Sequence, residues 1–183
     1  MILHWEQMVL HYGPEIATHR PKFEAAGQTT YGLLCCRFAP DDKQLASRDG
    51  DHAEARLLQH QNWTEHIPRA LEHWEPRDSP IVVVLAINRS PCRNCSALLV
   101  TALEALHRRF PVACDQNRFI LASRGIYEDA RMQQATTRND LVRLKGAGWE
   151  LCVLQTGPTL PPVGNHLLEG IQDVAGRGFV RLG

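Results

Sequence analysis

The hydrophobic residues of this chain follow two alternating patterns, which together predict an α/β protein. Strand-forming residues dominate five short segments, and residues 81–87 form an unbroken apolar run, typical of a strand covered on both faces. Apolar residues at helical spacing fill most of the intervals between these segments. The five predicted strands are 29–38, 43–48, 81–87, 118–123 and 150–155.

The order of these elements predicts one mixed sheet. Turn-forming residues at 39–42 join the first two strands as an antiparallel hairpin. A helix from Pro91 to about Phe110 follows the third strand, and a helix over 128–145 follows the fourth. Because a crossover helix connects neighbouring parallel strands, we expect the fourth and fifth strands to be parallel.

The length of the chain, 183 residues, predicts one domain over residues 1–183. Its core is expected at about 29–155, with an N-terminal helix over 1–12 and a C-terminal helix at about 166–174 as additions. Hydrophobic residues make up 44% and charged residues 22%, which is ordinary for a soluble globular protein. The formal net charge is zero, so the composition indicates no overall basic surface for nucleic acid.

No segment of the sequence predicts insertion into a membrane. The longest uncharged apolar run, residues 81–87, is far too short to span a bilayer, and the N-terminus lacks the basic and apolar regions of a secretory signal. We therefore expect a cytoplasmic protein, or one that a signal-independent secretion system delivers into a target cell.

Two short stretches carry the side chains with the clearest chemistry. One is Asp51-His52-Ala53-Glu54, and the other is Ser90-Pro91-Cys92-Arg93-Asn94-Cys95. Both are expected at helix starts, where Cys92 and Cys95, three residues apart, share one face. Zinc prefers nitrogen and sulfur ligands, and a catalytic zinc site leaves its fourth position for water. His52, Cys92 and Cys95 are therefore the predicted zinc ligands.

Two other interpretations of the cysteine pair are weaker. A structural zinc site normally has four protein ligands, often from two Cys-x-x-Cys pairs, and the sequence holds one such pair. A redox Cys-x-x-Cys motif is favoured by a strand–helix context but does not explain the His-x-Glu at a second helix start. Glu54 favours catalysis, because a hydrolytic deamination needs a carboxylate beside zinc that shuttles protons from water to the ring nitrogen and the leaving amine.

His-x-Glu followed by Pro-Cys-x-x-Cys is the pattern of zinc-dependent nucleobase deaminases. From about Thr29 to Gln155 the chain resembles the cytidine deaminase-like superfamily, which implies a three-layer α/β/α fold. It is most similar to the nucleic-acid-editing branch of AID/APOBEC enzymes and bacterial toxin deaminases. The resemblance rests on the Ser-Pro-Cys-x-x-Cys motif, on residues 121–129 and on the helix at 141–148. It implies that Glu54 acts in converting cytosine to uracil in single-stranded DNA.

The resemblance also implies which residues bind the substrate. Tyr127 would stack on the flipped base and Arg124 would steady the surrounding loop, although Tyr127 also suits a partly buried aromatic at a strand end. Asn88 and Ser90, at the carboxyl end of a strand, would line the pocket or cap the following helix. Arg89 stands where AID/APOBEC enzymes commonly have a Trp, which favours the toxin-type members; a toxin would bring an immunity protein as a partner.

Other substrates and one other class of protein remain open. RNA or tRNA, double-stranded DNA and free cytidine are alternative substrates of the same chemistry. An inactive deaminase fold that binds nucleic acid or a partner is the alternative from another class. The intact Glu54 favours an enzyme.

Overall fold

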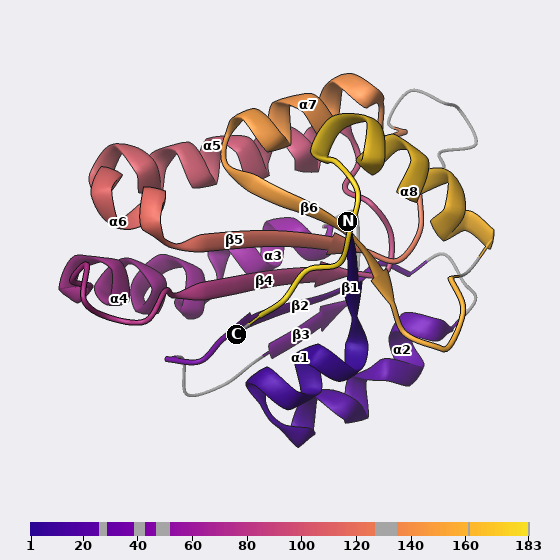
Figure 1. Cartoon of the computed structure of the whole chain (residues 1–183), viewed down its shortest axis with the longest axis horizontal. Helices are drawn as coiled ribbons and strands as arrows, with labels where there is room; N and C mark the ends of the chain where they lie inside the picture. The colour runs from indigo at the N-terminus through magenta and orange to yellow at the C-terminus, as the bar shows by residue number, and fades with distance from the viewer. Residues whose placement is uncertain (26–28, 39–42, 47–51, 127–134, 161, 183) are drawn as a thin grey trace.

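The apolar run at the middle of the chain forms strand β4 (Val82–Ile87), and all six of its side chains are buried. The computed structural model describes residues 1–25, 29–38, 43–46, 52–126, 135–160 and 162–182. Within these ranges β4 lies in a six-stranded mixed sheet of order β1-β6-β5-β4-β2-β3 (Figure 1). The other strands are β1 (Ile2–His4), β2 (Tyr31–Cys36), β3 (Lys43–Ala46), β5 (Arg118–Ser123) and β6 (Trp149–Gln155).

The sheet confirms the predicted α/β class and contains all five predicted strands. Strands β2 and β3 pair antiparallel, as the hairpin prediction requires, with Gly32 opposite Leu45. Strands β5 and β6 are parallel, with Leu121 opposite Leu151, and β4 is parallel to β5. The carboxyl ends of β4, β5 and β6 therefore meet at one edge of the sheet.

The sixth strand corrects the prediction of a helix over residues 1–12. Residues 2–4 form β1, which adds to the free edge of β6 in parallel, with Leu3 opposite Leu154. Helix α1 (Trp5–Tyr12) begins only after it. Three residues are too few to show strand periodicity, and the hydrogen bonds that hold them come from a strand about 150 residues away.

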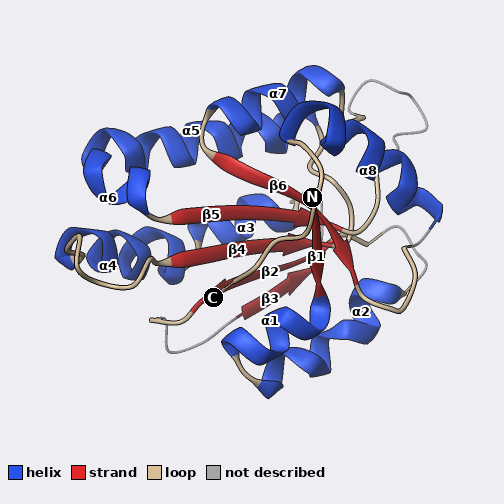
Figure 2. Cartoon of the chain, viewed as in Figure 1, coloured by secondary structure: helices blue, strands red, loops and turns tan. Residues whose placement is uncertain are grey.

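Helices cover both faces of the sheet, which makes three layers (Figure 2). Alternate residues of β4 point to opposite faces: Leu85 packs with the larger group of helices and Val84 with the smaller N-terminal group. The N-terminal group is α1, η1 (Pro14–His19) and α2 (Arg20–Glu24). The larger group is α3 (Ala53–Gln59), η2 (Asn62–His66), α4 (Ile67–His73), α5 (Arg93–Arg109), α6 (Pro111–Gln116), α7 (Arg138–Gly146) and α8 (Pro162–Ala175).

Helix α7 begins at Arg138, and residues 128–134 of the helix predicted over 128–145 lie outside the described residues. Residues 135–137 are not helical, and Thr137 caps the helix by accepting a hydrogen bond from the Asp140 amide. The Asp140 carboxylate accepts one from the Thr137 amide in return, which completes a capping box.

Helix α8 is longer than the predicted 166–174. In the described part of the chain, no helix has the length and apolar character needed to cross a membrane.

A close approach between β2 and α3 fixes the position of the helix that follows His52. A Cβ added to Gly32 would lie 2.7 Å from Cδ1 of Leu57 and 3.2 Å from Cβ of Ala53, both on buried sides of α3. The absence of a side chain at Gly32 thus lets α3 rest directly on the strand.

We expect Gly32→Ala to lower the free energy of unfolding by about 1–3 kcal/mol, because the added methyl group overpacks this contact. Gly146→Ala is the matched control, since nothing lies within 4 Å of its added Cβ. That variant should be neutral or more stable by up to about 1 kcal/mol. Urea unfolding measures both, and equal stabilities would contradict the close packing.

Candidate metal centre

The two predicted ligand stretches meet beside the carboxyl end of β4, at the starts of two helices. His52 is the N-cap residue of α3, with an extended backbone, and Cys92 is the N-cap residue of α5. Both helices lie on the same face of the sheet and contact each other. Since the positive ends of helix dipoles favour negative charge, this junction suits a thiolate.

His52, Cys92 and Cys95 form a group that can hold a metal ion. Their ligand atoms all lie within 4.8 Å of one another, and His52 Nδ1 is 3.4 Å from Cys92 Sγ. The two thiols come from one turn of α5 and the imidazole comes from α3. The structure therefore brings together all three predicted ligands.

The two thiols differ in how readily they lose a proton. Hydrogen bonds from the side chain and the backbone amide of Cys95 lower the pKa of Cys92 to about 6, against the opposing effect of burial. The same interaction and burial raise the pKa of Cys95. Cys92 thus loses its proton more readily than Cys95, and a metal that takes both sulfurs displaces the proton of Cys95.

Glu54 places a buried carboxyl group next to the three ligand side chains. It lies in the first turn of α3 and is 1% exposed, and its Oε2 atom has no hydrogen-bond partner among the residues that the structure describes. Burial raises its pKa to about 7, while the Cys95 thiol interacts with it through a hydrogen bond. A carboxyl group with this pKa can accept and release a proton near neutral pH, as general acid–base catalysis requires.

Ser90 is fixed by a threonine that the sequence did not single out. The Thr136 hydroxyl donates to the Pro91 carbonyl oxygen at 2.7 Å and lies 2.6 Å from Ser90 Oγ. Because a threonine has one hydroxyl proton, Ser90 is the donor in the second bond, which leaves its oxygen as an acceptor. The Ser90 amide also donates to the Gly125 carbonyl oxygen. These bonds join the segment before α7 to the start of α5.

We expect Thr136→Val to lower the free energy of unfolding by about 1 kcal/mol, because the Pro91 carbonyl and Ser90 hydroxyl lose their common partner. Thr101→Val, at an exposed position of α5, should change it by less than about 0.5 kcal/mol. Urea unfolding compares them. If both variants were as stable as the wild type, the Thr136 hydroxyl would not hold the segment before α7 in place.

The other predicted substrate residues lie at the same edge of the sheet. The Asn88 side chain accepts from the Tyr31 amide at 2.9 Å and donates to the Thr29 carbonyl oxygen at 3.1 Å, so its amide joins β4 to the start of β2. Arg124 follows β5 and donates through Nε to Thr156, at the end of β6. Tyr127 lies outside the described residues.

No protein-family model matches this chain, and no curated protein is similar to it in sequence.

Proposed function

We propose that this protein is a zinc-dependent deaminase that hydrolyses cytosine to uracil in single-stranded DNA. The observation that carries the proposal is Glu54, a buried carboxyl beside one imidazole and two thiols, with one oxygen that has no hydrogen-bond partner among the described residues. A structural metal site does not need such a group, because burying a carboxyl group that is only partly hydrogen-bonded is costly. A hydrolytic site needs it to move protons.

The donor set supports zinc as the metal. One nitrogen and two sulfurs are donors that zinc prefers, and three protein ligands leave one tetrahedral position for water. Zinc–nitrogen and zinc–sulfur bonds at the tetrahedral angle place their donor atoms about 3.5 Å apart. His52 Nδ1 and Cys92 Sγ are 3.4 Å apart.

The proposed reaction assigns a proton path to Glu54. When bound, zinc would supply a water whose pKa is lowered toward neutrality. Glu54 accepts a proton from the attacking water and delivers it to the ring nitrogen next to C4. It then takes the second proton from the hydroxyl group now on C4 and passes it to the amine, so that ammonia leaves and C4 becomes a carbonyl. In the metal-free protein, burial raises the pKa of Glu54 to about 7, which favours proton exchange near neutral pH. The Ser90 hydroxyl, which bonds to Thr136, lies at the edge of the site.

Two features support a polynucleotide substrate over free cytidine. The parallel pairing of β5 and β6 agrees with the resemblance to the nucleic-acid-editing branch. Three arginines follow the carboxyl ends of strands or begin helices at this edge, where they suit backbone phosphates: Arg93, Arg124 and Arg138. We further propose a bacterial toxin-type role, with an immunity protein as partner and delivery by a signal-independent secretion system.

The test compares uracil formation from single-stranded DNA, duplex DNA, RNA and free cytidine at matched cytosine concentrations. The proposal expects the highest kcat/KM on single-stranded DNA, with one equivalent of ammonia for each uracil. A preference for RNA or duplex DNA would change the substrate within the same chemistry. Activity on cytidine alone would refute the polynucleotide assignment. No activity on any of the four substrates would favour an inactive deaminase fold that binds nucleic acid or a partner.

A further inference from the structure

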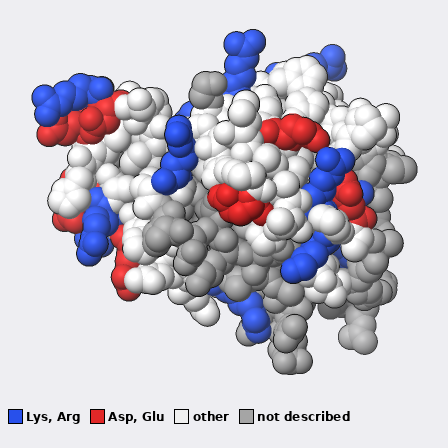
Figure 3. Space-filling view, turned by 90° about the horizontal axis from the view of Figure 1, so that it is seen from below, with Lys and Arg blue, Asp and Glu red and all other residues white. Residues whose placement is uncertain are grey.

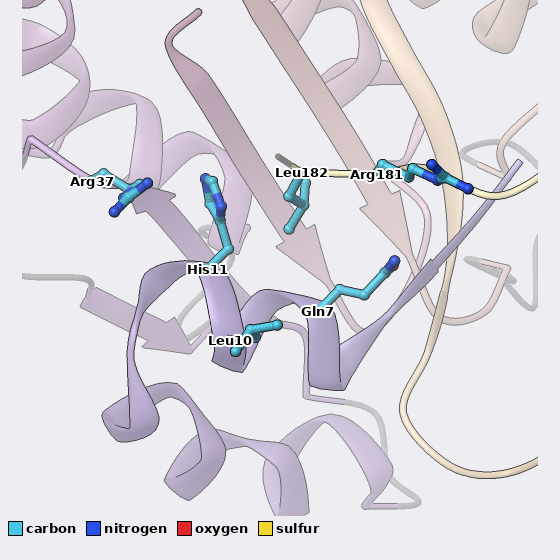
Figure 4. Close-up of a pocket in the computed structure, with 6 residues that line it drawn as sticks. All are labelled: Gln7, Leu10, His11, Arg37, Arg181 and Leu182. Atoms are coloured by element: carbon cyan, nitrogen blue, oxygen red, sulfur yellow. The ribbon is translucent and has the colours of Figure 1, made fainter. Parts of the chain in front are cut away.

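A hollow lies at the opposite edge of the sheet from the metal centre. It has a volume of about 460 Å³ and opens beside α1, the residues after β2 and the C-terminal residues (Figure 4). Arg37 directly follows β2, whose last residue, Cys36, pairs with Val83 near the amino end of β4. The six residues of β4 therefore separate it from the metal centre by about 20 Å. The hollow is lined by Gln7, Leu10, His11, Arg37, Arg181 and Leu182.

Within the described ranges of the chain, no acidic side chain lines this hollow to balance its positive charge. Its lining in the described residues includes two arginines and a histidine and no carboxylate. Neither Arg37 nor Arg181 forms an ion pair within the part of the chain that the structure describes, whereas Arg20 and Arg118 both do. Burial and the nearby Arg37 guanidinium lower the pKa of His11. A bound anion would relieve the repulsion between these groups.

The polar side chains of this hollow suit the binding of a phosphate group. On the face seen in Figure 3, basic and acidic side chains are interspersed, in agreement with a net charge of zero. The ionisable side chains that line the hollow in the described part of the chain, Arg37, Arg181 and His11, are all basic. Arginine binds phosphate through two parallel hydrogen bonds, and a glutamine amide adds a donor for a further oxygen.

The hollow also offers apolar contact between its polar groups. In the view of Figure 4, His11 and Arg37 lie on one side, Gln7 and Arg181 on the other, and the two leucines between them. Leu10 is 90% exposed, which is unusual for a leucine at the mouth of a charged hollow. The volume is within the range of about 300–1,000 Å³ of ligand sites. A ligand that fits is anionic at one end, apolar in its middle and polar at its other end.

We infer that this hollow binds an organic phosphate of about the size of a nucleotide, with its phosphate on Arg37 or Arg181 and its apolar part on Leu10 and Leu182. The phosphate belongs either to a free mononucleotide or to the backbone of a nucleic acid strand. This site is independent of the proposed deamination, because none of its residues contacts the metal centre.

The test uses probes that contain no cytosine, so that failure of the deaminase proposal does not affect it. Adenosine 5′-monophosphate, adenosine and a 12-mer of deoxyadenylate are titrated at an ionic strength of about 0.1 M, the small ligands by calorimetry and the 12-mer by fluorescence anisotropy. The variants are Arg37→Glu/Arg181→Glu and, as a matched control, Arg143→Glu on the exposed side of α7. Thermal melting verifies that each variant is folded.

We expect the double variant to weaken binding of at least one phosphate probe by about tenfold or more, while Arg143→Glu stays within about twofold of wild type. Adenosine should bind more weakly than its monophosphate. An effect on the monophosphate identifies a free nucleotide as ligand, and an effect confined to the 12-mer identifies a strand. The inference would be overturned if the wild type bound neither phosphate probe, or if the double variant bound both as tightly as the wild type does. It would also be overturned if Arg143→Glu weakened binding as much as the double variant does.

Discussion

Glu54→Gln is expected to lower kcat for deamination by about 10²–10⁴-fold or more while the zinc content stays near one ion per chain. The amide keeps the size of the buried side chain but can no longer accept a proton from water or pass one to the leaving amine. Steady-state uracil formation gives kcat, and elemental analysis of the same preparation gives the zinc content.

Glu104→Gln is the matched control for this substitution. Glu104 lies on the exposed side of α5 and loses the same charge in the variant, with no contact to the metal centre. It should retain wild-type kcat. The Glu54→Gln protein should also be at least as stable as wild type in metal-free buffer, since the substitution removes a buried carboxyl with an unpartnered oxygen. Full activity in Glu54→Gln would refute the assigned proton path.

Removal of the metal is expected to abolish activity and to lower the melting temperature by about 8–16 °C. Zinc held at about 1,000 times its Kd contributes about 4 kcal/mol to folding, and a chain of this size shifts by about 2–4 °C per kcal/mol. Calorimetric melting with and without a chelator measures the shift. Re-addition of zinc should restore both activity and melting temperature.

Cys92→Ala should reproduce the chelated state, because it removes one of three ligands and the N-cap acceptor of α5 together. Cys114→Ala, at a buried cysteine of α6 outside the ligand group, is the control. It should keep its zinc and lose about 1 kcal/mol of stability through the small cavity. A Cys92→Ala protein that retains zinc and responds to chelation like wild type would exclude this thiolate as a ligand.

The group of residues that can hold a metal ion could be predicted because it follows from local spacing along the chain. Cys92 and Cys95 share a helix turn whatever the rest of the chain does, and Pro91 marks where that turn starts. Glu54 follows His52 closely enough that both reach one helix end. Strand β4 could also be predicted, because an unbroken apolar run is visible in the sequence without knowledge of its neighbours in the sheet.

Only the tertiary structure decided the features that join distant segments. The pairing of β1 with β6, the bonds of Thr136 to Ser90 and Pro91, and the hollow with Arg37 and Arg181 each connect segments more than 40 residues apart. Such contacts depend on how distant parts of the chain pack together, because a short segment has little conformational preference of its own. The sequence by itself thus determined the α/β class and the donor atoms, whereas packing decided which residues surround them.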